Sequence, residues 1–331
     1  MRMGKLLTVS VAAYGVEQYI RNTLDSIVNC GRIDDIEILV NDDGGKDNTL
    51  AIVKEYEEKY PGSVIAVHKE NGGYGSVINK NVELATGKFF KQLDGDDWFD
   101  TDNIDKYMDV LDKTDADIVI TVTNEVYEDE GRTNVRDRFS EQEEGLYDFS
   151  SFPLTVNSSM HSTTYRTEIL RHEDCRITEG MFYTDVEYLC NPLKYADKVY
   201  VTHIPLYCYR LGREGQSVSK TGYLKHLGDL DHLLYKLMDI RSQIPSDAAV
   251  KRAFMQTRLR VTFNLVVQCH LLLPPTKENK EGLRKIFGDL KAYDKDLYDK
   301  IISTRKYNKI LDMSNFALYR PVRVIINRRW K

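Results

Sequence analysis

The sequence predicts an α/β fold in which a doubly wound, mostly parallel sheet is followed by a helical extension. Over about the first 125 residues, short apolar runs alternate with segments whose apolar residues recur at helical spacing. This alternation is typical of a parallel sheet with helices on both faces. From about residue 222 onward the apolar spacing is helical. We therefore predict an α/β domain over residues 1–218 and a helical extension over residues 219–331.

The individual elements follow from the same alternation. Short apolar runs predict strands at residues 6–14, 36–41, 64–68, 88–93 and 117–122. Helical periodicity between them predicts helices at residues 16–29, 48–60, 102–113 and within 72–87. The highly charged stretch 127–145 is predicted to be a solvated excursion, whereas 158–166 and 198–210 have the pattern of further strands.

Composition excludes several classes of protein. With 42% hydrophobic and 29% charged residues, the 331-residue chain has an ordinary globular balance. Its net charge of −5 gives no general attraction for nucleic acid, so we expect no nucleic-acid partner. Five cysteines without CxxC spacing fit neither a disulfide framework nor a zinc site, which favours a reducing, cytoplasmic compartment. No run of about 18 apolar residues occurs, so we expect a soluble or peripheral protein.

Polar residues cluster where three of the predicted strands end. Asp42 and Asp43 follow the second strand, the run from Asn71 to Gly75 follows the third, and the run from Asp94 to Asp97 follows the fourth. Ligands of such sheets bind beyond the carboxyl ends of the strands. The sequence therefore predicts a ligand site at this edge of the sheet.

Two interpretations of the first cluster, "VNDDGGKDNT", remain open. Strand-end aspartates followed by glycines form ordinary turns, with Asp47 or Asn48 as the cap of the next helix. Alternatively, a carboxylate accepts hydrogen bonds from a base N–H or from ribose hydroxyls, and the glycines admit a nucleotide close to the backbone. A Walker A loop is absent, and the Gly-Tyr-Gly run at residues 73–75 lacks the third glycine of a dinucleotide fingerprint.

The acidic stretch "KQLDGDDWFD" favours a divalent cation. Asp94, Asp96 and Asp97 end an apolar strand, and an aromatic pair follows them. An acidic loop is often only a solvated surface, but burying three carboxylates without a cation is costly. One or two carboxylates together with a substrate diphosphate are the ligands that Mg²⁺ or Mn²⁺ prefers. Asp100 lies beyond the aromatic pair, where a helix cap is the simpler role.

Several ordered motifs resemble one enzyme family. The stretches "VSVAAYGVEQYI", "VNDDGGKDNT", "ENGGYGSVINKNVELATGKFFKQLDGDDWFD" and "TDVEY" resemble the inverting family 2 glycosyltransferases of the GT-A fold, over roughly residues 5–220. The resemblance implies that residues 1–218 bind a nucleotide sugar, more specifically a UDP-sugar, and are catalytic. It also implies Mn²⁺ or Mg²⁺ as cofactor. The acceptor would be a saccharide or lipid-linked saccharide, in bacterial polysaccharide or glycoconjugate assembly.

The resemblance also assigns roles to single residues. Asp43 resembles the carboxylate that reads the nucleotide base, Asp94 the residue near ribose or metal, and Asp96 and Asp97 the cation ligands. Ile78 replaces an arginine of the family pattern, and we expect Arg210 or Arg213 to supply the missing charge. The predicted substrate- or nucleotide-binding residues are Ala13, Tyr14, Glu17, Asp42, Asp43, Asn71, Gly72, Gly73, Asn79, Asp94, Gly95, His161, Arg210 and Arg213.

The general base is predicted from "TDVEY". Displacement at an anomeric carbon needs a carboxylate that takes the proton of the acceptor hydroxyl. Asp185 aligns with the second member of the family's acidic pair, Thr184 replaces the first, and Glu187 is the second choice. The alternative is that Asp185 only caps a helix that begins at Val186. His161 is either a packed histidine or a residue that faces the acceptor.

Three further alternatives follow from the rest of the chain. A nucleotidyltransferase would have a similar sheet, but it would require a basic glycine-rich loop after the first strand. A catalytically inactive nucleotide- or sugar-binding module is the non-enzymatic alternative. The stretch "ALYRPVRVIINRRWK" alternates basic and apolar residues, and it is either a docked segment with solvated arginines or a peripheral contact with the inner face of the plasma membrane.

Overall fold

A mixed sheet with four parallel strands on one side organises the N-terminal part of the protein. The computed structural model describes residues 4–152, 158–212 and 220–329. The parallel strands occur in the order β3-β2-β1-β4. Their bounds are β1 (Leu7–Ala13), β2 (Ile36–Asp42), β3 (Val64–His68) and β4 (Phe89–Asp94).

Beyond β4 the sheet becomes mixed. Its order continues β9-β6-β10-β5 among the described residues. The bounds are β9 (Thr163–Arg166), β6 (Ile118–Tyr127), β10 (Lys198–Leu211) and β5 (Trp98–Phe99). The short strand β9 lies between β4 and β6 and is antiparallel to both, so β6 and β10 run in the same direction as β4.

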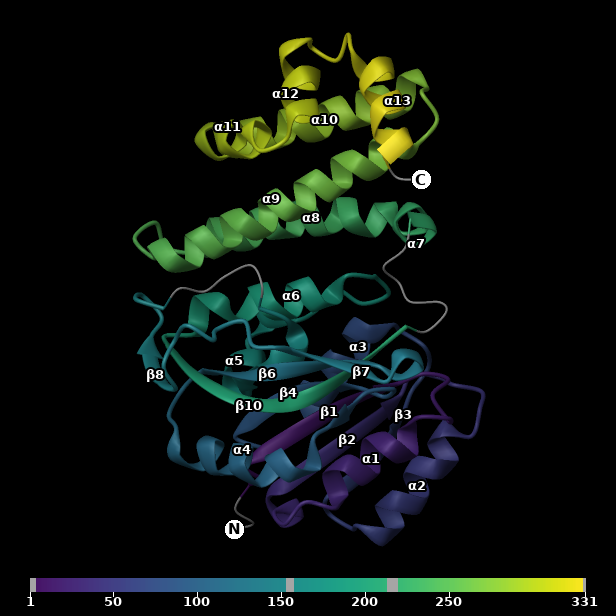
Figure 1. Ribbon diagram of the computed structural model, residues 1–331, viewed down its shortest axis with the longest axis vertical. Helices are drawn as coiled ribbons and strands as arrows, with labels where there is room; N and C mark the ends of the chain where they lie inside the picture. The colour runs from purple at the N-terminus through teal and green to yellow at the C-terminus, as the bar shows by residue number, and fades with distance from the viewer. Residues whose placement is uncertain (1–3, 153–157, 213–219, 330–331) are drawn as a thin grey trace. The chain divides into compact units, whose positions relative to one another are not determined.

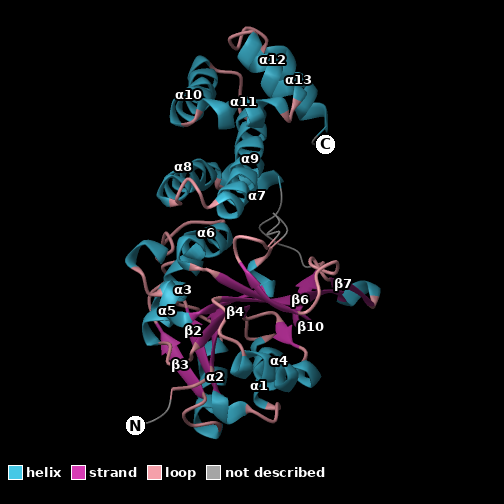
Figure 2. Cartoon of the chain, turned by 90° about the vertical axis from the view of Figure 1, so that its left-hand side faces the viewer, coloured by secondary structure: helices cyan, strands magenta, loops and turns pink. Residues whose placement is uncertain are grey.

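Helices cover both faces of the sheet, as Figures 1 and 2 show from two directions. One face carries α1 (Ile20–Val28), α2 (Thr49–Lys59) and α4 (Thr101–Lys113). The other side carries α3 (Tyr74–Leu84), α5 (Thr167–Leu170) and α6 (Thr184–Cys190). The doubly wound fold predicted from the strand–helix alternation is therefore confirmed.

The apolar strands and the helical stripes form one core. Val9 and Val11 of β1 are fully buried, as are Ile20, Leu24 and Ile27, which recur at helical spacing in α1. A central parallel strand is covered on both faces, which is why these strands have nearly continuous apolar runs. This core fixes the carboxyl ends of β1, β2 and β4 side by side.

Two expectations about local structure are wrong. The charged stretch 127–145 is not only an excursion, because β7 (Arg132–Arg136) pairs antiparallel with the end of β6, and β8 (Gly145–Asp148) begins a pairing with β10. Most side chains of β7 are exposed. The charged residues of this stretch therefore indicate that its side chains face solvent, and they do not indicate that its backbone is unpaired. His161 does not lie in a strand, since a 3₁₀ turn at Met160–Ser162 precedes β9.

The chain divides into two compact units. Residues 1–214 with 248–251 form the first unit, and residues 215–247 with 252–331 form the second. The helices after the sheet are α7 (Lys220–Lys225), α8 (Leu227–Gln243), α9 (Ala249–Leu272), α10 (Lys277–Tyr293), α11 (Lys295–Ser303), α12 (Lys306–Met313) and α13 (Tyr319–Arg329). In the second unit Phe287 packs against the rings of Phe263 and Phe316, with centroids 5.1 and 5.0 Å away. None of the described helices is both long enough and apolar enough to cross a bilayer.

Candidate functional site

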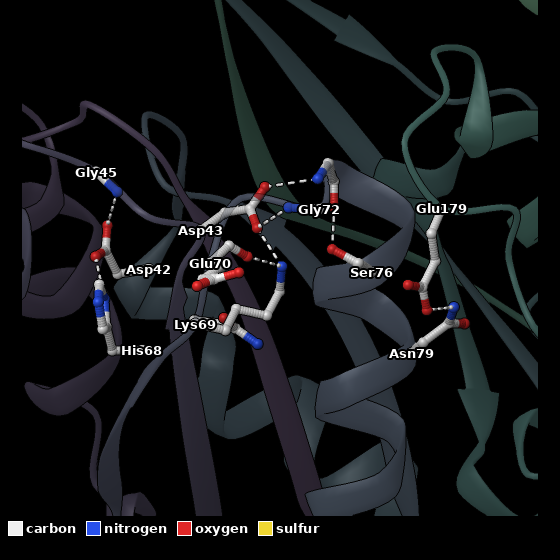
Figure 3. A network of polar contacts seen from close by, with 12 residues as sticks. Asp42, Asp43, Gly45, His68, Lys69, Glu70, Gly72, Ser76, Asn79 and Glu179 are labelled. Atoms are coloured by element: carbon white, nitrogen blue, oxygen red, sulfur yellow. Dashed lines mark hydrogen bonds and ion pairs between the residues drawn. The ribbon is translucent and has the colours of Figure 1, made fainter.

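Asp43, at the carboxyl end of β2, fixes the loop that follows β3. Its carboxylate pairs with the ammonium of Lys69 and accepts hydrogen bonds from the backbone N–H groups of Gly72 and Gly73, each at 2.9 Å (Figure 3). The residue is only 4% exposed. The backbone N–H of Asp43 in turn donates to the carbonyl of Ala13 at 2.9 Å. Three of the carboxylate's acceptor positions are therefore already used within the protein.

Asp42 and Glu17 also hold neighbouring segments together. Asp42 is 1% exposed, lies 2.8 Å from the imidazole Nδ1 of His68, and accepts a hydrogen bond from the N–H of Gly45 at 3.2 Å (Figure 3). Glu17 accepts hydrogen bonds from the backbone and side-chain nitrogens of Asn48, both at 2.9 Å. In contrast, Tyr14 is 62% exposed just beyond β1, and Asn71 is exposed as well. Tyr14 and Asn71 are thus predicted nucleotide-binding residues whose side chains are exposed to solvent.

The end of β4 contains a group of potential metal ligands. Ligand atoms of Asp94, Asp97 and His161 lie within 4.8 Å of one another. Among the described residues, this is the group of three or more potential metal ligands that lie so close together. Asp94 accepts a hydrogen bond from the hydroxyl of Tyr74, and its other oxygen lies 3.7 Å from Nε2 of His161. Two carboxylates and an imidazole at this spacing could hold a divalent cation.

Asp97 is the buried member of this group. It is 1% exposed, and its carboxylate accepts hydrogen bonds from the hydroxyl of Tyr207 at 2.7 Å and from the N–H of Arg210 at 2.8 Å. Burial, and then the negative charges of Asp94 and Asp96, raise the pKa of Asp97 well above its ordinary value. The two hydrogen bonds leave this excess of negative charge largely uncompensated, and a divalent cation would offset it.

Asp96 and Arg210 lie beside this group. Asp96 is not a member of the group that contains Asp97, while Asp94 and His161 are. Arg210 has a side chain only 8% exposed, donates to the carbonyl of Asp96 at 2.8 Å, and pairs with Glu128. Its guanidinium also lies 4.7 Å from the ring centroid of Trp98. Arg210 therefore clamps the acidic loop, and Arg213 lies outside the described residues.

The predicted base lies at the start of α6. Asp185 is exposed in the first turn of a helix that begins at Thr184, so the alternative of a cap before Val186 is wrong. The preceding Tyr183 has a left-handed backbone with a φ of 65°, a conformation that costs about 1–3 kcal/mol for a non-glycine residue. Glu187 is 3% exposed and accepts hydrogen bonds from the N–H and hydroxyl of Thr178 at 2.9 and 3.0 Å, so it has a structural role.

The pKa of Tyr209, in β10, is affected both by the aspartates at the end of β4 and by Asp185. Burial, and then the negative charges of Asp97, Asp94, Asp96 and Asp185, raise the pKa of Tyr209 to about 12. The ring of His161 packs against two tyrosines of the same strand, with its centroid 4.7 Å from that of Tyr207 and 4.4 Å from that of Tyr209. Sequence analysis missed Tyr74 and Tyr207 as partners of the aspartates. The alternation of Tyr207 and Tyr209 in a strand, which places both on one face, was the available signal.

Asn79 joins α3 to the segment before Asp185. Its amide nitrogen donates to the carbonyl of Ile177 and to the carboxylate of Glu179, both at 2.9 Å (Figure 3). The N–H of Gly180 donates to the carbonyl of Gly72 at 2.8 Å. Gly95 is similarly structural, because a Cβ there would lie 2.8 Å from the carbonyl oxygen of Ala12. Asn79 and Gly95 therefore support the site through contacts within the protein.

Gly75 allows α3 to approach this segment closely. A Cβ at Gly75 would overlap the carbonyl oxygen of Thr178 and lie 2.8 Å from Cγ2 of Ile177. Gly75→Ala is therefore expected to lower the free energy of unfolding by about 1–3 kcal/mol, measured by thermal unfolding. Lys80→Ala, at a partly exposed position of α3, is the control and should change it by less than about 0.5 kcal/mol. Equal melting temperatures for the two variants would contradict the close contact.

Lys91 is a buried cation in the middle of β4. It is 0% exposed, and its ammonium donates a hydrogen bond to the carbonyl of His161 at 2.9 Å. The rings of Phe99 and Tyr207 lie with their centroids 5.9 Å from the nitrogen. In the part of the chain that the structure describes, no carboxylate forms an ion pair with it. Burial accordingly lowers the pKa of Lys91 to about 7.

This lowered pKa predicts a pH dependence of stability. An unfolded lysine titrates near 10.4, so between about pH 7 and pH 10 the unfolded chain binds a proton that the folded chain does not. The free energy of unfolding is therefore expected to rise with pH in this window, by at most about 1.4 kcal/mol per pH unit from this group. Lys91→Met should flatten the rise, as measured by urea unfolding at several pH values. Lys80→Met should keep the wild-type slope, and the same slope in Lys91→Met would exclude Lys91 as its source.

Comparison with known proteins gives matches over most of the chain. The family model described as glycosyl transferase family 2 matches residues 8–173. EpsH of Bacillus subtilis (strain 168) is 28% identical over 217 residues, which cover 62% of this chain and 60% of EpsH. The minor teichoic acid biosynthesis protein GgaB of the same strain is 26% identical over 222 residues, 65% of this chain and 24% of GgaB. The chain thus spans less than two thirds of the length of both relatives.

Solved structures match nearly the whole chain. The crystal structure of S. aureus TarS 1-349 in complex with UDP-GlcNAc has a TM-score of 0.73 at 20% identity, and the match covers 98% of this chain and 92% of that one. The mannosyltransferase PcManGT from Pyrobaculum calidifontis, in complex with GDP-Man and Mn²⁺, has a TM-score of 0.55 at 14% identity and covers 97% and 86%. At these identities the likeness establishes the fold.

Proposed function

Since the chain belongs to glycosyl transferase family 2 and has the GT-A fold, it is a glycosyltransferase, and we propose that it moves a sugar from a nucleotide diphosphate sugar to an acceptor hydroxyl with inversion. The observation that carries this proposal is the position of Tyr209. Its hydroxyl is influenced both by Asp185 and by the aspartates at the end of β4. A carboxylate able to act as base and a group able to hold a cation thus both influence the same tyrosine, which supports the proposal that they belong to one site.

The residues present fit a divalent cation. Asp94, Asp97 and His161 supply two carboxylates and one imidazole, and burial together with the negative charges of Asp94 and Asp96 raises the pKa of Asp97, a cost that a cation would offset. Carboxylates suit both Mg²⁺ and Mn²⁺, whereas an imidazole is a more usual ligand of the transition metals. We therefore favour Mn²⁺ over Mg²⁺. The ion would neutralise charge that develops on the departing nucleoside diphosphate.

The remaining chemistry is assigned to the protein. Asp185 takes the proton of the acceptor hydroxyl as that oxygen attacks the anomeric carbon, and the nucleotide leaves from the opposite face. A single displacement inverts the configuration and needs no covalent nucleophile. The exposed ring of Tyr14 lies just beyond β1, where we expect the nucleotide base to stack on it.

The donor and acceptor classes are part of the same proposal. We infer a UDP-sugar as donor, a choice supported by the structural likeness to a protein that was solved with UDP-GlcNAc. We infer a saccharide or lipid-linked saccharide as acceptor, in bacterial polysaccharide or glycoconjugate assembly, supported by the likeness to a teichoic acid biosynthesis protein. None of the five cysteines, all of which lie in the described part of the chain, forms a disulfide, which supports a reducing, cytoplasmic location.

A screen of nucleotide sugars with Mn²⁺ tests the proposal. We expect release of UDP from one UDP-sugar, transfer of its sugar to a saccharide acceptor, and loss of both on chelation of the metal. Calorimetry with UDP and Mn²⁺ is the second arm. Nucleotide binding without transfer or hydrolysis of any donor would instead indicate the inactive binding module, and release of pyrophosphate from a nucleoside triphosphate would indicate a nucleotidyltransferase.

A further inference from the structure

The helix α13 is attached to the second unit through one face only. Tyr319, Val322 and Ile326 are buried, and Arg323 donates to the carbonyl of Leu273 at 2.6 Å. These positions follow the spacing of one helical face. The exposed positions of the opposite face are Arg320, Pro321, Val324, Ile325 and Arg328.

The preceding helix α12 repeats this exposed pattern. Together with the residue before it, its exposed positions have the same spacing and are Arg305, Lys306, Lys309, Ile310 and Met313. Met313 is 85% exposed, and on α13 Ile325 is 53% exposed. A surface helix ordinarily directs polar residues to solvent. The consecutive helices α12 and α13, which contact each other, instead direct basic and large apolar side chains to solvent. We call the five exposed residues named for each helix, ten in all, the basic–apolar surface.

The charge of this region is strongly one-sided. Residues 305–331 contain eight Lys or Arg residues and one acidic residue, Asp312, in a chain whose net charge is −5. The carboxylate of Asp312 accepts a hydrogen bond from the hydroxyl of Tyr298. Among the described residues, no carboxylate pairs with a cation of the basic–apolar surface. The neighbouring α10 and α11 differ, because Lys285 pairs with Asp289 at 2.6 Å and Lys295 pairs with Asp299 at 2.7 Å.

The turn between α12 and α13 is held in one conformation. Asn315 and Phe316 both have a left-handed backbone, with φ values of 45° and 62°. Such residues persist only where their surroundings fix them. Phe316 is 3% exposed against Phe287, and the guanidinium of Arg284 donates to the carbonyl of Asn315 at 2.8 Å. The two helices therefore have a fixed geometry without any ligand.

We propose that the basic–apolar surface docks on an anionic lipid bilayer. Basic side chains are attracted to anionic headgroups, and large apolar side chains enter the boundary between headgroups and acyl chains. A soluble polyanion would use the cations but give no role to Met313, Val324 and Ile325. A second copy of the chain would bring two positive surfaces together, and the like charges would repel. The proposal concerns the second unit and does not rest on the proposed reaction.

The test is co-sedimentation of the full chain with lipid vesicles. We expect binding to vesicles that contain phosphatidylglycerol and little binding to pure phosphatidylcholine. Binding should weaken strongly in about 1 M salt, where the Debye length falls to about 3 Å. The charge variant should bind at least about 100-fold more weakly, since each basic side chain near an anionic surface contributes about fivefold. It carries Arg305→Gln, Lys306→Gln, Lys309→Gln, Arg320→Gln and Arg328→Gln.

Two further variants make the test specific. Met313→Ser with Val324→Ser and Ile325→Ser should weaken binding about tenfold without any change of charge. The matched control removes five exposed cations from α10 and α11 of the same unit and should retain binding. It carries Lys277→Gln, Lys285→Gln, Lys291→Gln, Lys295→Gln and Lys300→Gln. Circular dichroism and the melting temperature verify that each variant is folded.

Four outcomes would overturn the proposal. Equal loss of binding in the charge variant and in the matched control would show a general charge effect. Unchanged vesicle binding of the serine variant would exclude the apolar contact. Retention on heparin by the wild-type chain, without binding to anionic vesicles, would indicate a soluble polyanion. Dimers in light scattering that the serine variant abolishes, again without vesicle binding, would indicate a second copy as the occupant.

Discussion

Asp97→Asn is expected to lower kcat/KM for sugar transfer about 10³-fold while leaving the fold intact. A cation site contributes several kcal/mol of transition-state stabilisation, and about 4 kcal/mol corresponds to this factor. The amide can keep both existing contacts, because its oxygen can accept from the N–H of Arg210 and its nitrogen can donate to the hydroxyl of Tyr207. Turnover with Mn²⁺ measures the loss of activity. Calorimetry measures the affinity for Mn²⁺, and the melting temperature shows whether the fold is intact.

Two neighbouring aspartates supply the controls. Asp100→Asn makes the same chemical change at the cap position of α4, where the side chain forms no capping hydrogen bond, and it should change kcat/KM less than about twofold. Asp96→Asn tests the ligand predicted from the sequence but absent from the group of Asp94, Asp97 and His161. Wild-type turnover in Asp97→Asn together with lost turnover in Asp96→Asn would assign the cation to Asp96 instead.

Asp185→Asn is expected to lower kcat by about 10²–10⁴-fold, the usual contribution of a general base. The exposed side chain contacts the acceptor side in our proposal, so the affinity for nucleotide and Mn²⁺ should remain unchanged. Single-turnover kinetics with saturating donor separate the chemical step from binding. Activity that returns as pH rises, with hydroxide replacing the base, would support the same role.

Glu187→Gln is the matched variant two residues away. Its carboxylate is buried and accepts two hydrogen bonds from Thr178, so the substitution should lower stability by about 1 kcal/mol and have a much smaller effect on kcat. If Glu187→Gln lost the chemical step and Asp185→Asn kept it, the base would be Glu187, the second choice from the sequence.

Local pattern predicted the parallel half of the sheet well. β3 occupies the predicted residues 64–68, because an apolar run bounded by turn residues is a strong local signal. The position of β9 between β4 and β6 had no such signal, since the same segment suits any neighbouring strand. The pairing of β7 with β6 was hidden by its charged side chains, which indicate exposure and not hydrogen bonding.

In the candidate site too, features set by local sequence could be predicted, whereas contacts between distant segments could not. The convergence of Asp43 and Asp94 at one sheet edge follows from strands of known direction. The approach of His161 to Asp94 depends on a turn that comes about 70 residues later in the chain. The ion pair between Asp43 and Lys69 could not be predicted either, because it depends on the path of the loop after β3. Spacing within one motif therefore identified acidic residues, but it could not decide which of them share a ligand.

The central place of β9 has a consequence for synthesis on the ribosome. β4 and β6 both leave the ribosome before β9, which pairs with Phe89 of one and Ile118 of the other through Arg166 and Tyr165. Until then each strand has an open edge able to pair with other chains. Tyr207 and Arg210, which hold Asp97, follow later still. A nascent chain is therefore exposed to misassembly until more than half of it has been made, and its acidic centre is completed only after β9 has been made.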